Sequence, residues 1–526
     1  MNDGTIEFPP ADEVVTRRIL ERHARERPDE HAASGPSGES WTWAQALANA
    51  YRSAQCLRSL GVRPGDHVLL FLPNGLDWLR AWWGIASLGA VMVTVNTAYR
   101  GDILRRVCED SGAALIVTTP ELAERLEAAD IRLQVVVPPA LLAGSPIPLD
   151  DESAEFEVWT VHAVNFTSGT TGPAKGVITP YLATYMGGIN VMGAAGGLTA
   201  QDRWLVDTPL FHVSGQMTAL ACISAGASMA IREQFAGTNY WQVAAETGAT
   251  HSLLVATMAN FLLSRSPSPG DQAHRLRVVV LAPMVSDPAG FRTRFGVEQL
   301  GSVYGQTEIS SPLLIAPGAE IIMGSVGRPR RGAELRIVDE HDRPLPVGAV
   351  GELVVRTDRP WEMNLGYLGH PAESIAAWRN GWFHTGDAFR RDLAGNFYYV
   401  DRLRDTLRRR GENISSFHIE GEALSHPDVL ECACVGVASP LGEDEVKIFV
   451  VPRPERAVDP AALVTYLADR LPGFMVPRFV EVVDELPKNQ TLRIQKLELR
   501  ARGNSSATWD RHTASPMTIG SPVPVE

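Results

Sequence analysis

Short, wholly apolar segments alternate with longer amphipathic ones along the first third of the chain. Runs of this kind are typical of strands that are buried on both faces: HVLLFL (67–72), AVMVTV (90–95) and SGAALIVTT (111–119). Between them, LDWLRAWWGIASLG (76–89) predicts a buried helix, and Ser40 or Thr42 can cap an earlier helix that Gly61 ends. Strands separated by helices in this order predict a mainly parallel sheet covered on both faces.

The pattern changes twice further along the chain. RGAELRIVDEHDRPLPVGAVGELVVR (331–356) alternates and is rich in turn residues, which predicts an antiparallel, β-barrel-like subdomain. From about Arg404, strand and helix patterns predict a small α+β domain. The fold class is therefore α/β: a large N-terminal domain of parallel α/β sheets with a barrel-like subdomain (1–403), a small mobile α+β domain (404–500), and a Ser/Pro/Thr-rich tail expected to be disordered (501–526).

Composition narrows the class of protein. The 526 residues carry a formal net charge of −13, which argues against a nucleic-acid binder. Uncharged stretches such as 176–201 and 208–231 are broken by Gly, Pro, Asn or His, so we expect no membrane span. The five cysteines are scattered, and Cys432 and Cys434 share one face of a predicted strand, which favours buried thiols and a cytoplasmic location.

The most specific local feature is the run TSGTTGPAKG, from Thr167 to Gly176. It follows an apolar strand-like segment and combines three glycines, four hydroxyls and Lys175. Glycines let successive backbone N–H groups form a concave anion site. The run lacks the Walker pattern, and the simpler interpretation is a flexible surface loop. We nevertheless predict a polyphosphate site here.

This loop resembles the signature loop of the adenylate-forming superfamily, which includes acyl- and aryl-CoA ligases, peptide-synthetase adenylation domains and luciferases. Further motifs occur in the family's order: PLFHVSGQ (209–216), YGQTE (304–308), VGRP (326–329), GEL (351–353), GYLGHP (366–371), GWFHTGD (381–387), DRLRD (401–405), RRGENIS (409–415) and LPKNQTLRIQK (486–496). The resemblance covers about residues 15–500 and is nearest to the crotonobetaine/carnitine-CoA ligase-like branch.

The resemblance implies a role for each motif in nucleotide binding. Tyr304 would stack on adenine, Thr307 would contact the α-phosphate, and Glu308 would help to hold Mg²⁺. Asp387 would accept hydrogen bonds from the ribose hydroxyls, with Arg402 as a second ribose or phosphate contact. The complete set implied for ATP is Thr167, Ser168, Gly169, Thr170, Thr171, Gly172, Lys175, Pro283, Tyr304, Gly305, Thr307, Asp387 and Arg402.

The same comparison implies an acid pocket and a catalytic cation. The pocket residues would be Phe211, His212, Val213, Leu281, Met284 and Ser302, and the Gly-rich run 186–197 permits a roomy apolar site. Family members usually carry Gly-Lys where this chain has Leu492-Arg493. We expect Arg493 to act in place of that lysine during adenylation, with Lys488 or Lys496 as alternatives.

Adenylation and acyl transfer would use different faces of the small domain. The resemblance implies a hinge at Arg404 and a thiol-step face that carries Arg409, Arg410, Gly411, Glu412 and Asn413. The expected reaction joins a small carboxylic acid to AMP, with ATP and Mg²⁺, and then transfers the acyl group to coenzyme A. The chain could act as a homodimer.

Two other functions stay open at the level of sequence. An ATP-dependent amide ligase would pass the acyl adenylate to an amine, and a non-catalytic relative would bind the nucleotide or acyl-AMP without reaction. Retention of Lys175, Glu308 and Asp387 argues against the second. A stand-alone peptide-synthetase domain is disfavoured because no carrier-domain serine motif follows residue 500.

Overall fold

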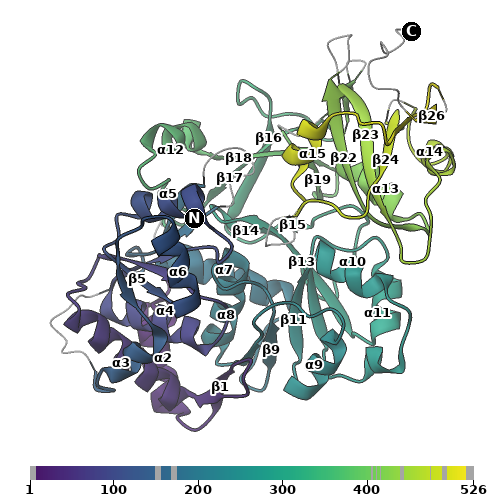
Figure 1. The fold of residues 1–526 in the computed structure, drawn as a ribbon. Helices are drawn as coiled ribbons and strands as arrows, with labels where there is room; N and C mark the ends of the chain where they lie inside the picture. Colours follow the sequence, from purple (N-terminus) through teal and green to yellow (C-terminus); the bar gives the residue numbers. More distant parts are fainter. Residues whose placement is uncertain are drawn as a thin grey trace.

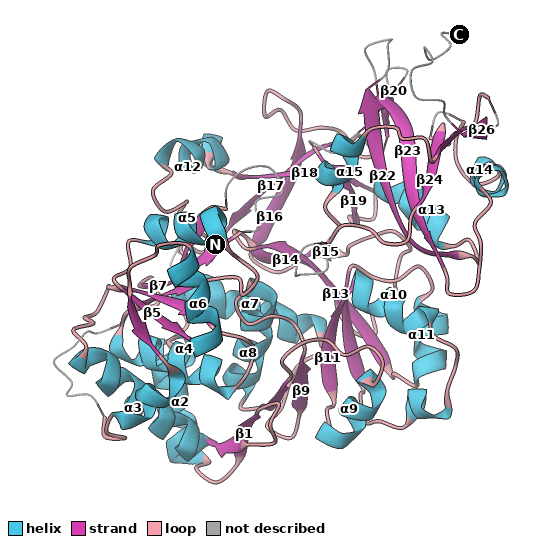
Figure 2. Ribbon diagram, in the orientation of Figure 1, coloured by secondary structure: helices cyan, strands magenta, loops and turns pink. Residues whose placement is uncertain are grey.

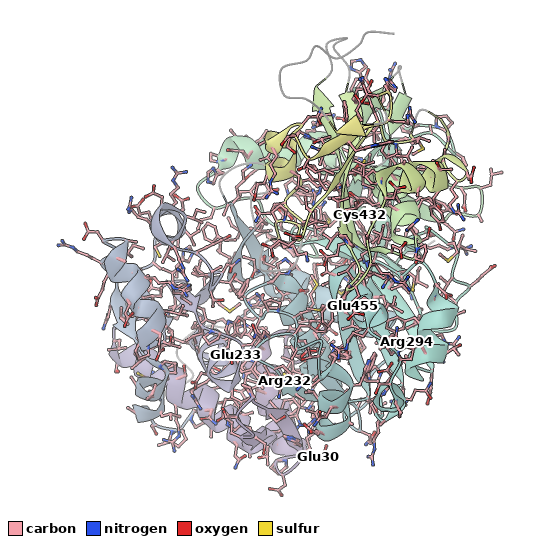
Figure 3. All side chains as sticks on the ribbon, turned by 45° about the vertical axis from the view of Figure 1, so that its right-hand side comes forward. Glu30, Arg232, Glu233, Arg294, Cys432 and Glu455 are labelled. Carbon is pink, nitrogen blue, oxygen red and sulfur yellow. The ribbon has the colours of Figure 1, made fainter. Side chains whose placement is uncertain are left out.

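The computed structural model describes residues 7–148, 156–167, 174–403, 407–409, 412–414, 416–438, 444–473, 475–488, 494–513 and 515–516. Elements up to residue 403 form a large N-terminal unit, and those from residue 416 onward form a separate sheet with its own helices (Figure 1). Cys432 lies in the C-terminal unit and Arg294 in the N-terminal unit (Figure 3).

Two largely parallel sheets form the N-terminal unit. The first has the order β6 (Gln134–Val136), β5 (Leu115–Thr118), β3 (His67–Phe71), β4 (Val91–Thr94), β7 (Val161–Phe166) and β8 (Gly176–Pro180). The second has the order β15 (Arg328–Pro329), β14 (Ser310–Ile315), β13 (Gln299–Gln306), β12 (Val278–Ala282), β11 (His251–Val255), β9 (Arg203–Val206), β10 (Ser228–Ile231), β1 (His31–Ser34) and β2 (Ser40–Thr42). Their antiparallel strands, β8, β14, β15 and β2, lie at or next to the sheet edges.

Helices fill the space between the two sheets and cover their outer faces (Figure 2). The inner layer and the neighbouring N-terminal turn consist of α1 (Ala11–Val14), α2 (Thr16–Glu26), α3 (Trp43–Ser59), α4 (Leu76–Leu88), α7 (Tyr181–Ala194), α8 (Val213–Ala225) and the 3₁₀ turn Pro138–Ala143. The outer helices are α5 (Gly101–Ser111) and α6 (Pro120–Ala128) on the first sheet, and α9 (Tyr240–Thr247), α10 (Ala256–Ser264), α11 (Pro288–Phe295) and the 3₁₀ turn Pro269–Gln272 on the second.

The predicted two-sided burial of the strands is confirmed. In β3, Val68 and Leu70 face the inner helices, whereas Leu69 and Phe71 face α5 and α6. Since successive strand residues point to opposite faces, a strand covered on both sides needs an unbroken apolar run. The predicted helix cap is also present: Thr42 and Gln45 form a reciprocal capping box at the start of α3.

The predicted antiparallel subdomain is a four-stranded sheet. Its strands follow the order β16 (Ala333–Val338), β17 (Gly351–Thr357), β18 (Phe383–Arg391) and β19 (Phe397–Arg402), with α12 (Pro371–Ala377) and the 3₁₀ turn Arg379–Gly381 between β17 and β18. Within the described residues β16 does not pair with β19, so the sheet is open and the barrel-like shape predicted for it is not a closed barrel.

The C-terminal unit is the predicted α+β domain. Its sheet has the order β22 (Val429–Ala438), β23 (Asp444–Pro452), β24 (Phe479–Val482), β25 (Thr508–Asp510) and β26 (Ser515–Pro516). The accompanying elements are α13 (Ser416–Leu424), α14 (Pro460–Ala468), α15 (Lys496–Arg502) and the hairpin of β20 (Leu407–Arg409) and β21 (Glu412–Ile414). Cys432 and Cys434 share one face and are buried, as predicted.

The prediction of a disordered tail is wrong for residues 501–513 and 515–516. Strand β25 pairs with β24, and Asp510 accepts two hydrogen bonds from the buried Arg478 guanidinium, at 3.2 and 3.1 Å. The Thr508 hydroxyl accepts a hydrogen bond from the buried Lys447 ammonium at 2.9 Å. The tail thus completes the pairing of two buried cations that also pair with Glu481 and Glu445, and this specific pairing outweighs its polar composition.

No helix in the described part of the chain is long and apolar enough to span a membrane.

One buried acid lies directly after β9: Asp207 is 4% exposed, and burial raises its pKa to about 7 against the opposing effect of Arg232. The folded chain therefore holds this proton at pH values at which the unfolded chain, with an aspartate pKa near ~3.9, has released it.

We expect this proton to make stability fall as pH rises. The contribution of Asp207 should be fully present below about pH 4 and be lost as pH increases to about 7, roughly 2–4 kcal/mol in all. Asp207→Asn should remove that slope. Urea unfolding at pH 5 and pH 8 measures it, and identical pH dependence of the two proteins would refute the prediction.

Candidate functional site

Polar side chains converge where β13 ends and meets β18 of the open sheet. Asp387, in β18, is 1% exposed, and its Oδ2 accepts hydrogen bonds from the Tyr304 hydroxyl and from Gln306 Nε2, the latter at 2.7 Å. Arg402 Nε, from β19, lies 2.9 Å from Asp387 Oδ1. Gln306 Nε2 also donates to the Thr385 carbonyl at 3.0 Å. Three strands thus hold one carboxylate in a fixed orientation.

The Tyr304 side chain is held from two sides. Its ring packs edge-on against Phe389, with centroids 4.8 Å apart, while its hydroxyl donates to Asp387. Burial, reinforced by the adjacent Asp387 charge, raises the pKa of Tyr304 well above its usual range. The phenol therefore stays protonated and acts as a donor to the carboxylate.

Gly305 makes this geometry possible. A Cβ on Gly305 would lie 1.9 Å from the Ser310 carbonyl oxygen, across the irregular pairing of β13 with β14. Only glycine allows two backbones to approach so closely. The resulting irregularity places Thr307 and Glu308 in the turn between the two strands.

A second group lies around Glu308. The Tyr367 hydroxyl donates to Glu308 Oε1 at 3.0 Å, and Lys175 Nζ lies 5.3 Å from the centroid of the Tyr367 ring. Burial raises the pKa of Glu308, opposed by its backbone and Tyr367 hydrogen bonds and by the Arg402 charge. A divalent cation bound here would favour the ionised carboxylate.

A backbone hydrogen bond between Thr167 and Lys175 closes the base of the predicted phosphate loop. Thr167 donates through its backbone N–H to the Lys175 carbonyl at 3.0 Å, and β7 and β8 run antiparallel on either side. Lys175 therefore directly precedes β8, the strand that leads away from the loop. Five predicted phosphate contacts lie outside the described residues: Ser168, Gly169, Thr170, Thr171 and Gly172.

The predicted acid-pocket residues occupy two kinds of position. His212 caps α8, its Nδ1 accepting from Ser214 N at 3.2 Å, and Phe211 and Val213 lie beside it. Ser302 is buried and donates to the Leu281 carbonyl at 2.6 Å. Leu281 is fully buried in the core under α9–α11, so its predicted place in the pocket wall is wrong.

Pro283 and Met284 follow β12 and are partly buried. In the Gly-rich run 186–197, Gly187 and Gly188 do not provide the room that was predicted. A Cβ on Gly188 would lie 2.9 Å from Leu220 Cβ, and one on Gly187 would lie 2.7 Å from the Met217 side chain. These glycines let α7 pack closely on α8, so the space is filled by a helix.

The C-terminal residues are not assembled with the nucleotide group in this arrangement. Lys488 Nζ pairs with Glu431 of β22 at 2.6 Å. The hairpin that carries Arg409, Glu412 and Asn413 lies at the upper end of the C-terminal sheet, away from β13 (Figure 2). Three of the predicted residues of this region, Arg404, Arg410 and Gly411, and the predicted catalytic cation Arg493 lie outside the described residues.

Lys496, one alternative for the catalytic cation, is instead part of a partly buried link between the two units. Its ammonium pairs with Glu420 at 2.8 Å and donates to the Ser416 hydroxyl. Ser416 in turn donates to Asp401 of β19 through its hydroxyl and, at 3.0 Å, through its backbone N–H. In this arrangement Lys496 therefore has a structural position between the two units.

We expect Lys496→Met to cost about 1–3 kcal/mol, because it leaves the mostly buried Glu420 carboxylate without its ion pair. Lys488→Met is the matched control. The Lys488–Glu431 pair is about a quarter exposed and should contribute about 0–1 kcal/mol. Amide hydrogen exchange of α13 should show lost protection only for Lys496→Met; equal protection in both variants would contradict this.

Two residues of the site were missed by sequence reasoning. Gln306 and Tyr367 both belong to recognised motifs, YGQTE and GYLGHP, but neither was given a role. Gln216 of PLFHVSGQ is a third polar residue without a predicted role: it donates at 2.8 Å to Asn165 of β7, the strand that leads to the loop. The position of these three residues inside recognised motifs was the sequence signal that could have identified them.

Comparison with known families agrees with this arrangement. A family model described as AMP-binding enzyme matches residues 20–368, and one described as AMP-binding enzyme C-terminal domain matches residues 418–492. The chain belongs to the AMP-binding enzyme family. This confirms the resemblance to the adenylate-forming superfamily and the prediction of an AMP-forming ligase of the acid–thiol class.

Relatives of this AMP-binding enzyme match over most of their length. A crotonobetaine/carnitine–CoA ligase of Escherichia coli is 30% identical over 499 residues, covering 89% of this chain and 94% of the relative. A benzoate CoA ligase structure from Burkholderia xenovorans is 25% identical with a TM-score of 0.83, covering 92% and 99% of the two chains. O-succinylbenzoate coenzyme A synthetase from Bacillus subtilis, with ATP and magnesium, is 25% identical with a TM-score of 0.81, covering 91% and 98%.

Proposed function

We propose that this AMP-binding enzyme is an ATP-dependent carboxylate–CoA ligase. The observation that carries the proposal is the convergence of Asp387, Tyr304 and Arg402 beside a second group formed by Glu308 and Lys175. The first group offers a buried, oriented carboxylate for a diol. The second offers a carboxylate and an ammonium for a metal–polyphosphate.

The Glu308 environment suits magnesium. Mg²⁺ usually takes one or two protein carboxylates and completes its shell with water and phosphate oxygens. In the described residues, no cluster of three or more His, Cys, Asp or Glu side chains could hold a metal, which fits a cation that arrives with the nucleotide. When bound, Mg²⁺ would neutralise phosphate charge, with Glu308 as its protein ligand.

In the proposed first half-reaction, a carboxylate oxygen of the acid attacks the α-phosphorus of ATP and pyrophosphate leaves. Lys175 and the loop N–H groups offset charge on the polyphosphate, and Asp387 fixes the ribose. Two anions must be brought together, and positioning of this kind can supply ~7–11 kcal/mol. Arg493 is proposed to offset charge at the α-phosphate and the acid.

In the second half-reaction, the thiolate of coenzyme A attacks the acyl carbon and AMP leaves. We propose that the C-terminal unit turns about Arg404 so that the face with Arg409, Arg410, Gly411, Glu412 and Asn413 reaches the adenylate. The location of the hairpin away from β13 supports such a rearrangement. All five cysteines are free thiols, which fits the proposed cytoplasmic location.

The test supplies ATP, Mg²⁺ and a panel of acids that includes those of the relatives: crotonobetaine, carnitine, benzoate and o-succinylbenzoate. We expect acid-dependent exchange of labelled pyrophosphate into ATP, and an acyl-CoA when coenzyme A is added. An acyl amide formed only with an amine would replace the CoA proposal by the amide-ligase alternative. Nucleotide binding without exchange for any acid would leave the non-catalytic alternative.

A further inference from the structure

One short segment connects the two parts of the nucleotide site. Residues 364–368, here the bridging segment, run between Glu308 and strand β8. Asn364 donates to the Glu308 carbonyl through its backbone N–H at 3.0 Å and its side chain at 2.8 Å. Further along, Leu368 N donates to the Gly176 carbonyl at 2.8 Å, and Ile178 N donates to the Gly366 carbonyl at 3.0 Å. The segment is therefore bonded to both the Glu308 turn and the strand that follows Lys175.

Tyr367 belongs to this segment, and both the hydroxyl and the ring of its side chain contact residues of the site. The hydroxyl donates to Glu308 Oε1, and the ring faces the Lys175 ammonium. Its backbone N–H donates to Ser374 Oγ at 2.8 Å, and the Ser374 hydroxyl donates to the His370 carbonyl. The side chain thus starts from an anchored backbone and is half-buried, so few other orientations are open to it.

We propose that Tyr367 is a positioning residue of the nucleotide site. Its hydroxyl holds the Glu308 carboxylate in the orientation required by the cation that accompanies ATP, and its ring holds the Lys175 ammonium in a fixed position. This positioning role rests on the proposed function. An unrestrained carboxylate or lysine would lose rotamer freedom when the ligand binds, and Tyr367 removes that cost beforehand.

The two roles belong to different atoms and can be separated. Tyr367→Phe removes the hydroxyl and keeps the ring, whereas Tyr367→Leu removes both. Binding of Mn²⁺ to the enzyme–ATP complex, followed by electron paramagnetic resonance, reports on Glu308. Binding of metal-free ATP in EDTA, followed by calorimetry, reports on Lys175. Neither readout requires turnover or knowledge of the acid.

We expect Tyr367→Phe to weaken Mn²⁺ binding about tenfold and to leave metal-free ATP binding within twofold of the unmodified enzyme. Tyr367→Leu should weaken both. Tyr398→Phe is the control, because the Tyr398 hydroxyl also donates to a carboxylate, that of Asp392, at 2.8 Å, but lies in β19 outside the site. It should change neither measurement.

A double-mutant cycle keeps the inference testable if one variant folds poorly. If the hydroxyl acts through Glu308, Tyr367→Phe should add nothing to the loss of Mn²⁺ affinity in Glu308→Gln. Unchanged Mn²⁺ binding in Tyr367→Phe, or additive losses in the cycle, would overturn the positioning role while leaving the proposed function intact. Absence of ATP binding in the unmodified enzyme would overturn both.

Discussion

Asp387→Asn is expected to weaken ATP binding roughly a hundredfold or more. The carboxylate is proposed to accept both ribose hydroxyls, and charge-assisted hydrogen bonds contribute about 1.5–3 kcal/mol each. The amide also mismatches its surroundings, because its NH₂ group must face Tyr304 and Gln306 or Arg402, all of which are donors. Calorimetric titration with ATP measures the change directly.

Asp392→Asn is the matched control for this substitution. Asp392 lies in the turn between β18 and β19 of the same sheet, where it binds Asn396 and Tyr398. The amide there should alter local stability slightly and leave ATP affinity within twofold. If folded Asp387→Asn also bound ATP within twofold of the unmodified enzyme, the carboxylate would have no role in holding the nucleotide.

Lys175→Met is expected to slow pyrophosphate exchange about 100- to 1000-fold. Methionine keeps an apolar stem and removes the charge that faces the Tyr367 ring, so the loss reports on stabilisation of the reacting phosphates. Stability should change little, since a cation–π contact at a partly exposed site contributes about 0.5–1 kcal/mol.

Lys175→Arg provides the comparison that separates charge from shape. The guanidinium keeps the charge but is larger and planar, so we expect activity between those of the unmodified enzyme and Lys175→Met. Initial exchange rates at saturating ATP and acid measure the series. Equal rates for Lys175→Met and the unmodified enzyme would show that the Lys175 charge does not stabilise the reacting phosphates.

The parallel sheets were predictable from sequence because burial on both faces leaves a direct mark on the chain. A strand with one face in water alternates apolar and polar residues, whereas the run around Leu69 and Leu70 is apolar at every position. The alternating direction of side chains along a strand also predicts where Leu281 points. In β12, residues 279 and 281 share one face, which packs beneath α9–α11. Its predicted role in the pocket came from family comparison and ignored that alternation.

Most contacts within the site cannot be predicted from local sequence patterns. Tyr304 and Asp387 meet although 83 positions separate them, and no periodicity links their segments. Only motif resemblance predicted both. Gln306 and Tyr367 were missed because their roles depend on contacts between three separate segments. The tail was misjudged for a related reason, since Asp510 is ordered by Arg478, whose burial the tail's composition does not reveal.

The central claim is that this site joins a carboxylic acid to AMP. Incubation with ATP, Mg²⁺, coenzyme A and an acid of the panel labelled with ¹⁸O in its carboxyl group tests it most directly. Attack of the carboxylate on the α-phosphorus must leave one labelled oxygen on AMP after acyl transfer, and mass spectrometry of AMP detects it. We predict one ¹⁸O in each AMP formed; unlabelled AMP, or formation of ADP in its place, would contradict adenylation of the acid.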